Sequence, residues 1–219
     1  MSGELELTAT PGFVEPRLRE EFPGLGLRFV VLPGRMRRSP RSVRQRLAAL
    51  GSRYRGGSVI AMRTQPIPHA YRAFYRQVGL DPDAARVPSE EAAVSRLLHG
   101  GFRSRDLIND ALLIAVVETG VAVWAVDGDR VAPGGLGIRT SVAGEALGTG
   151  ETAVPLAPGR MVVADAGGVH ALLFGDVARA HAVGPQTVSV SLFAVGVPGV
   201  PEIHLEEALW ICVDVLRAA

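Results

Sequence analysis

The 219-residue sequence lacks lysine entirely and contains a single cysteine, Cys212. One cysteine excludes an internal disulfide and a cysteine-rich zinc site, and its place on the apolar face of the last predicted helix indicates a buried structural thiol. No apolar run is long enough to cross a bilayer, since the longest, residues 111–126, contains Glu118 and Gly120. The N-terminal residues lack the basic and apolar regions of a signal peptide. These absences predict a cytoplasmic protein with no membrane partner.

Acidic residues are missing from one long stretch of the chain. Between Phe22 and Leu80 the sequence has 12 arginines and no aspartate or glutamate, although the whole chain balances 23 basic against 22 acidic residues. A GC-rich genome explains arginine in place of lysine, but it does not remove acids from 59 consecutive residues. Residues 1–105 carry a net charge of +9 and residues 106–219 carry −8. The arginines therefore meet either an anionic ligand or the acidic half of the chain.

Common catalytic and cofactor motifs are also absent. The sequence contains no phosphate-binding GxxxxGK[ST] loop, no GxGxxG after a strand, and no GxSxG, HExxH or CxxC motif. The histidines are scattered and are expected to be surface or capping residues rather than ligands: His69, His99, His170, His181 and His204. The sequence therefore predicts no metal site and no cofactor.

Turn residues and apolar spacing divide the chain into a helix-rich first half and a strand-rich second half. Strands are predicted at residues 27–32 and 57–62. One helix is predicted to begin after Ser39, which can cap it, and to stop at Gly51. Further helices are predicted at 68–78, 90–99, 106–119 and 201–217. Short apolar strands are predicted at 121–126, 136–140, 161–164, 169–174 and 187–195. This order predicts an α+β fold with a mostly antiparallel β core and flanking helices.

Five arginines lie within ten residues, around the start of the helix predicted after Ser39: Arg35, Arg37, Arg38, Arg41 and Arg44. Positive charge in the first turn of a helix opposes the helix dipole. A helix that presents arginine and free backbone N–H groups to phosphate would nevertheless have this composition. Tyr54 and Arg55 would extend such a surface with an aromatic ring for base stacking. The alternative is a solvated basic face without a ligand.

A second group of polar residues lies among the predicted strands. Asp127 ends a strand before Gly128, which is typical of a turn residue. Arg139 ends an apolar strand, and a buried guanidinium needs a carboxylate partner, for which Glu145 is the closest candidate in sequence. We interpret this pair as a structural clamp; the alternative is a pair that holds the amino or carboxylate group of a substrate.

The run AYRAFYRQVGLDPDAARVPSEEAAVSRLLHGG, residues 70–101, resembles stand-alone proteins built on the B3/B4 domain. This domain is the tRNA-binding and editing module of the phenylalanyl-tRNA synthetase β subunit. The order of later features agrees: a strand ending in Asp127, Arg139 followed by Gly144-Glu145, a strand ending in Asp165, then Asp176 and a long final strand. The resemblance implies a B3/B4-like domain over residues 66–219 and an amino-terminal extension, residues 1–65, packed on the core. It also implies tRNA as a partner.

The sequence departs from the synthetase pattern at positions that matter for editing. Asp110 matches the aspartate of the family's VDxxN helix start, while Leu113 takes the place of its asparagine. Trp124 stands where the synthetase has a histidine, and Phe193 stands where it has a late-strand glutamate. The resemblance therefore extends to fold and ancestry, whereas the editing chemistry is not carried over.

Three functions are consistent with these observations. The first is an RNA-binding module for tRNA or aminoacyl-tRNA, whose contacts would be Arg35, Arg37, Arg38, Arg41, Arg44 and Arg55. If such a module is also an enzyme, it would be a deacylase that hydrolyses mischarged aminoacyl-tRNA in trans. Its pocket candidates are Asp110, Trp124, Asp127, Arg139 and Glu145, with Glu145 as the ligand of an amino group. The second is a binding protein or enzyme for an amino-acid-like small molecule, without an RNA partner. The third is a non-catalytic partner of a synthetase, or of its own copy, with self-association through the oppositely charged halves.

Overall fold

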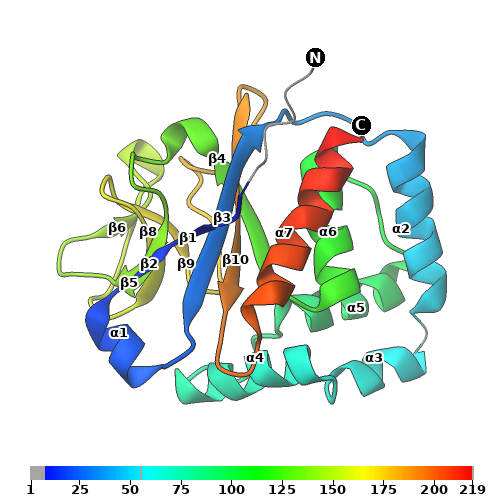
Figure 1. Ribbon diagram of the computed structural model, residues 1–219, viewed down its shortest axis with the longest axis horizontal. Helices are drawn as coiled ribbons and strands as arrows, with labels where there is room; N and C mark the ends of the chain where they lie inside the picture. Colours follow the sequence, from blue (N-terminus) through cyan, green and yellow to red (C-terminus); the bar gives the residue numbers. More distant parts are fainter. Residues whose placement is uncertain (1–7, 55, 219) are drawn as a thin grey trace.

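The computed structural model describes residues 8–54 and 56–218. A six-stranded sheet, a four-stranded sheet and a group of helices lie next to one another, with the four-stranded sheet in the middle (Figure 1). Most strand pairs in the two sheets are antiparallel. The predicted α+β fold with a mostly antiparallel β core is confirmed.

The central sheet joins strands from both ends of the chain. Its order is β1 (Thr10–Pro11), β3 (Gly26–Pro33), β10 (Ser189–Gly196) and β4 (Val123–Asp127). β10 pairs antiparallel with β3 from Ser189 opposite Pro33 to Gly196 opposite Gly26, and with β4 along its other edge. β10 is almost wholly buried because helices cover one face and the second sheet lies beyond the other. The boundary predicted at residue 65 stays a prediction, but the extension before it supplies β3, an inner strand.

The second sheet is built from shorter strands. Its order is β2 (Phe13–Val14), β5 (Gly137–Thr140), β8 (Met161–Ala164), β9 (Val169–Leu172), β6 (Ala146–Leu147) and β7 (Val154–Pro155). The β2–β5 and β6–β9 pairs are parallel and the others are antiparallel. The short helix α1 (Pro16–Glu21) connects β2 to the central sheet, and two 3-10 turns, Gly128–Arg130 and Gly150–Thr152, lie in the connections.

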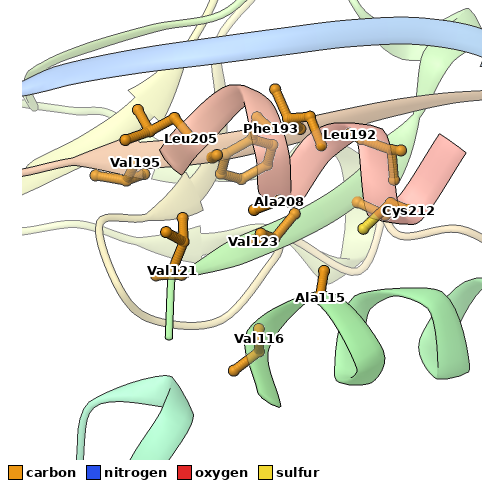
Figure 2. Packing of buried hydrophobic residues seen from close by; sticks show 14 of the residues in the cluster. Ala115, Val116, Val121, Val123, Leu192, Phe193, Val195, Leu205, Ala208 and Cys212 are labelled. Atoms are coloured by element: carbon orange, nitrogen blue, oxygen red, sulfur yellow. The ribbon is translucent and has the colours of Figure 1, made fainter. Parts of the chain in front are cut away.

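The helices other than α1 lie on the other side of the central sheet or below it (Figure 1). They are α2 (Arg41–Arg53), α3 (Gly56–Met62), α4 (Pro66–Gln77), α5 (Pro88–His99), α6 (Leu107–Thr119) and α7 (Glu202–Arg217). Figure 2 shows Ala115 of α6 and Ala208 and Cys212 of α7 close to β4 and β10. Cys212 is fully buried, so burial raises the pKa of its thiol and the structural assignment is confirmed. Over the described residues, no helix combines the length and the apolar character that a membrane crossing requires.

Three local predictions around α2 and α3 were wrong. The strand predicted at 57–62 is helix α3, because a short apolar run does not distinguish a strand from a helix. Gly51 does not stop α2, which continues to Arg53. Ser39 does not cap α2, since Pro40 occupies the N-cap position and the Ser39 hydroxyl donates to Asp110.

Candidate functional site

Five arginines on and before the first turns of α2 form what we call the arginine surface: Arg35, Arg37, Arg38, Arg41 and Arg44. The side chains of Arg35, Arg37, Arg38 and Arg41 are exposed, and that of Arg44 is half-buried. Within residues 8–54 and 56–218, four of these five, Arg35, Arg38, Arg41 and Arg44, form no ion pair. Arg55, the sixth candidate, lies outside the described residues. The structure thus presents several guanidinium groups to solvent together.

Other arginines of the acid-free stretch have acidic partners from later in the chain. Arg46 binds Glu118 with both ends of its guanidinium, at 2.9 and 2.6 Å. Arg28 pairs with Glu202 at 2.6 Å. Contact with the acidic half therefore accounts for part of the arginine content.

The buried ion pair of this stretch involves Arg72 of α4. Its guanidinium donates to both carboxylate oxygens of Glu90, at 3.1 and 2.9 Å, and to Asp83 at 2.8 Å. The side chains of Arg72 and Glu90 are 7% and 2% exposed, and Arg63 lies 3.7 Å from Glu90 as a second cation. The pair joins α4 to the start of α5. Nothing in the sequence spacing singled out either residue.

No described side chain at the start of α2 accepts a hydrogen bond from the free backbone N–H groups of its first turn. Pro40 at the N-cap position has no side-chain oxygen, and the first turn contains no acid. The first backbone N–H groups of a helix lack intrahelical partners, and together with the helix dipole they favour an anion. The cations of the arginine surface therefore stand where a helix already attracts negative charge.

Asp110 connects the arginine surface to a second loop. Its carboxylate is 1% exposed and accepts hydrogen bonds from the hydroxyls of Ser39 and Ser104, both at 2.5 Å, and from the backbone N–H of Arg105 at 2.9 Å. Ser39 lies within the arginine-rich segment, so this carboxylate holds Arg103 and Arg105 beside it. Sequence reasoning missed these two arginines because some 60 residues separate them from the cluster. It placed Asp110 in a substrate pocket, which stays a prediction, and the structure gives this carboxylate three internal donors.

A hollow of about 570 Å³ opens between the end of α5 and the start of α6. We call it the α5–α6 hollow; its walls include Ser95, His99, Phe102, Arg103, Arg105 and Asn109, and Asp110 also lines it. Arg103 and Arg105 are exposed and form no ion pair within the described part of the chain. The volume lies in the usual range for small-ligand sites.

The five predicted pocket residues do not converge on one cavity. Trp124 of β4 stacks on Phe193, its direct neighbour on β10, with ring centroids 5.6 Å and planes 14° apart. Asp127 ends β4, accepting from the Thr187 hydroxyl at 2.8 Å and from the backbone N–H of Asp129 at 3.1 Å. It therefore occupies the turn that its place before Gly128 indicated.

Arg139 and Glu145 form the predicted pair in the six-stranded sheet. Two hydrogen bonds of 2.8 and 2.5 Å join the guanidinium to the carboxylate, which also accepts from the backbone N–H of Val142 at 2.7 Å. The bond with Arg139 lowers the pKa of Glu145. Glu15 binds the neighbouring Thr140 through backbone and hydroxyl, at 2.7 and 2.8 Å. Since both oxygens of Glu145 have partners, the geometry favours the clamp over the ligand for an amino group.

A second depression lies between α1, the end of α4 and the six-stranded sheet. We call it the Phe174 groove; it has a volume of about 470 Å³, with a wall including Leu18, Phe22, Leu80, Met161, Leu173 and Phe174, and with Glu21 and Arg160 also lining it. Phe174 has a φ of 60°, the only positive φ of a non-glycine residue in the described chain. Its ring contacts Tyr75 and Trp124, with centroids 5.0 and 6.0 Å away. A non-glycine residue with positive φ stores backbone strain, which often accompanies a binding site.

Asp165, His170 and His181 form a buried cluster next to the β8–β9 turn. His170 Nε2 lies 2.7 Å from Asp165 Oδ2, and the two histidine rings are 4.1 Å apart. Burial opposes ionisation of Asp165, but hydrogen bonds from Ala132 and His170 outweigh it and lower the pKa of this carboxyl. The expectation of surface or capping histidines was wrong for this pair, which the strand pairing brings together. Among the described residues no group of three or more side chains is arranged to hold a metal ion.

Compared with known proteins, the sequence matches no protein-family model and no curated protein. The fold and the site geometry define the class of the protein: an α+β domain with an arginine surface at one helix N-terminus. The resemblance to the B3/B4 domain stays a prediction from the sequence.

Proposed function

We propose that this chain binds RNA through the arginine surface, with tRNA or aminoacyl-tRNA as its partner. The observation that supports this most directly is that Arg35, Arg38 and Arg41, exposed at the uncapped N-terminus of α2, form no ion pair within the described residues. A surface evolved only for stability would have acids at that position, because acids there favour the helix dipole. Arginine is suited to phosphate because its guanidinium forms two parallel hydrogen bonds. The sequence resemblance to the B3/B4 domain argues for tRNA among RNAs.

Hydrolysis of the aminoacyl ester is not part of this proposal. The positions that correspond to the histidine and the late-strand glutamate of the synthetase carry Trp124 and Phe193, which stack on each other. Neither side chain can accept or release a proton near neutral pH. Mischarged tRNA is therefore expected to bind without being deacylated, and a deacylation assay with wild type and Glu145→Ala checks this expectation.

Titration of a labelled tRNA at increasing salt tests the binding proposal. For wild type, we expect the logarithm of the affinity to fall linearly with the logarithm of the salt concentration. Replacing Arg38 and Arg41 by Ala should reduce the slope by about 0.7–0.9 for each lost phosphate contact. The matched control replaces Arg130 and Arg179, two exposed arginines elsewhere, by Ala and should keep the wild-type slope. Absence of tRNA binding at low salt would contradict the proposal.

The Phe174 groove supports a second candidate function, the binding of an amino-acid-like molecule. Apolar side chains such as Phe22, Leu80 and Phe174 form part of its wall, and an exposed cation, Arg160, and an exposed carboxylate, Glu21, also line it. Such a groove would take an apolar side chain, while Arg160 binds a carboxylate and Glu21 an ammonium group. In a thermal-shift assay with free apolar amino acids and their methyl esters, a stabilising free acid should lose its effect in Arg160→Ala and keep it in Arg179→Ala. If no compound raises the midpoint, this candidate fails.

A further inference from the structure

The α5–α6 hollow borders the arginine surface through one shared carboxylate. Ser39 and Ser104 donate to the same oxygen of Asp110, so the two arginine-bearing loops meet at this atom. The backbone N–H of Leu107 donates to the carbonyl of Arg37 at 2.8 Å, which fixes the loops a second time. A strand of RNA that lies on the arginine surface would therefore reach the hollow without crossing an intervening element.

The cations of the hollow have no acidic partner among the described residues. Arg103 and Arg105 form no ion pair there, and the one carboxylate on the exposed rim, Glu91, lies 3.5 Å from Arg86. The other carboxylate, Asp110, is fully engaged by neutral donors. Unlike the N-terminus of α2, that of α6 is capped by Asp106, so the loop arginines are the groups that would receive a phosphate here.

One wall of the hollow is aromatic and firmly held. The Phe102 ring packs edge-on against Tyr54, with centroids 5.8 Å apart, and the Tyr54 hydroxyl donates to the carbonyl of Val117 at 2.7 Å. Across the hollow, Asn109 binds Asp106 through its side-chain amide, which leaves its carbonyl oxygen as an acceptor. A rigid aromatic wall, an amide carbonyl and two cations are the groups that recognise an unpaired base and its phosphate.

We propose that the α5–α6 hollow binds an unpaired nucleotide of the RNA, with the base against Phe102 and the phosphate held by Arg103 and Arg105. This inference rests on the proposed RNA-binding function and specifies its substrate: an RNA with a single-stranded end next to a duplex. A duplex alone would engage the arginine surface through its phosphates, but its bases are stacked and cannot enter a hollow.

Fluorescence anisotropy with two RNAs tests this inference: a blunt duplex, and the same duplex with a short single-stranded overhang. Wild type should bind the overhang duplex about tenfold more tightly, the effect expected of one stacked base. Phe102→Leu, and separately Arg103→Ala with Arg105→Ala, should abolish this preference. The matched control, Arg38→Ala with Arg41→Ala, should weaken binding of both RNAs and keep the preference.

The possible failures are distinguishable. If wild type binds both RNAs equally, or if the preference survives in the Phe102 and loop-arginine variants, the hollow does not take a nucleotide and RNA binding at the arginine surface stands. If wild type binds neither RNA, the proposed function is wrong and the inference is wrong with it.

Discussion

Two groups of arginines in the acid-free stretch have opposite surroundings. Arg72 is buried and surrounded by carboxylates, and Arg46 and Arg28 are paired with acids more than 70 residues away in sequence. Arg38 and Arg41 are exposed and have no carboxylate partner in the part of the chain that the structure describes. The arginine content of the stretch alone therefore does not distinguish arginines that are paired within the fold from arginines that are exposed to solvent. The paired arginines join helices and strands of the fold, whereas Arg38 and Arg41 are available to a ligand.

The largest effect is expected from breaking the buried pair. Arg72→Met keeps most of the side-chain volume but leaves Glu90 buried without its main partner, so the free energy of unfolding should fall by about 3–5 kcal/mol. Urea denaturation measures this loss. Arg76→Met, at an exposed position of the same helix, should change stability by about 0.5 kcal/mol or less. If the two variants were equally stable, Arg72 would belong with the unpaired arginines.

Removal of Asp110 should affect both stability and RNA binding. Asp110→Ala leaves the Ser39 and Ser104 hydroxyls and the Arg105 N–H without their acceptor, at a cost of about 2–3 kcal/mol. Because the loops lose their common anchor, tRNA affinity should fall as well. Asp106→Ala removes a neighbouring carboxylate that caps α6 and accepts from the Asn109 amide, and should cost about 1 kcal/mol. Its tRNA affinity should fall less than that of Asp110→Ala, because the two arginine-bearing loops keep their common anchor, and an equal decrease would contradict the anchoring role.

A fall in pH is expected to reduce the stability of the fold through buried His181 while the charge of the arginines stays the same. Burial, and then the nearby His170, lower the pKa of His181 from its usual 6.5. The folded chain then binds fewer protons than the unfolded chain, so the stability due to neutral His181 is present above about pH 6.5 and is lost as the pH falls below it. The arginines keep their charge throughout this range.

Thermal unfolding at several pH values measures this effect. His181→Phe, which preserves a ring next to His170, should reduce the loss of stability below about pH 6.5. His69→Phe, at an exposed position, should follow the wild-type curve. An unchanged curve for His181→Phe would mean that another group causes the acid sensitivity.

The sequence predicted elements better than it predicted sites, and particular residues show why. Helix α4 followed from the spacing of Tyr71, Phe74 and Tyr75, which are all buried, because periodicity depends on local order alone. The strand predicted at 57–62 was wrong because six apolar and small residues fit either structure. The Arg139–Glu145 pair was found because its members are six residues apart.

Sites that depend on distant contacts were not predictable in this way. The rings of His170 and His181 meet because the segment after β9 folds back onto this strand. Arg103 lies beside the arginine surface because Ser39 and Ser104 share the carboxylate of Asp110. The arginine surface itself was predicted because its members are close in sequence. The sequence did not predict which arginines have acidic partners, since Glu118 and Glu202 are far from Arg46 and Arg28 along the chain.

The smallest change in stability is expected for substitutions of single exposed arginines. These substitutions also distinguish an arginine that binds RNA from one that is paired within the fold. Arg41→Glu places an acid in the first turn of α2, where the helix dipole favours negative charge, so stability should rise by about 0.3–1 kcal/mol. The same change puts a negative charge where we propose that phosphate binds, so tRNA affinity should fall. Arg46→Gln should act in the opposite way on stability, since it removes an exposed ion pair worth about 0.2–1 kcal/mol, with a smaller effect on tRNA affinity. Denaturation and tRNA titration of both variants decide the matter. If Arg41→Glu lowered stability and left tRNA affinity unchanged, Arg41 would be a structural residue and the arginine surface would lose its central member.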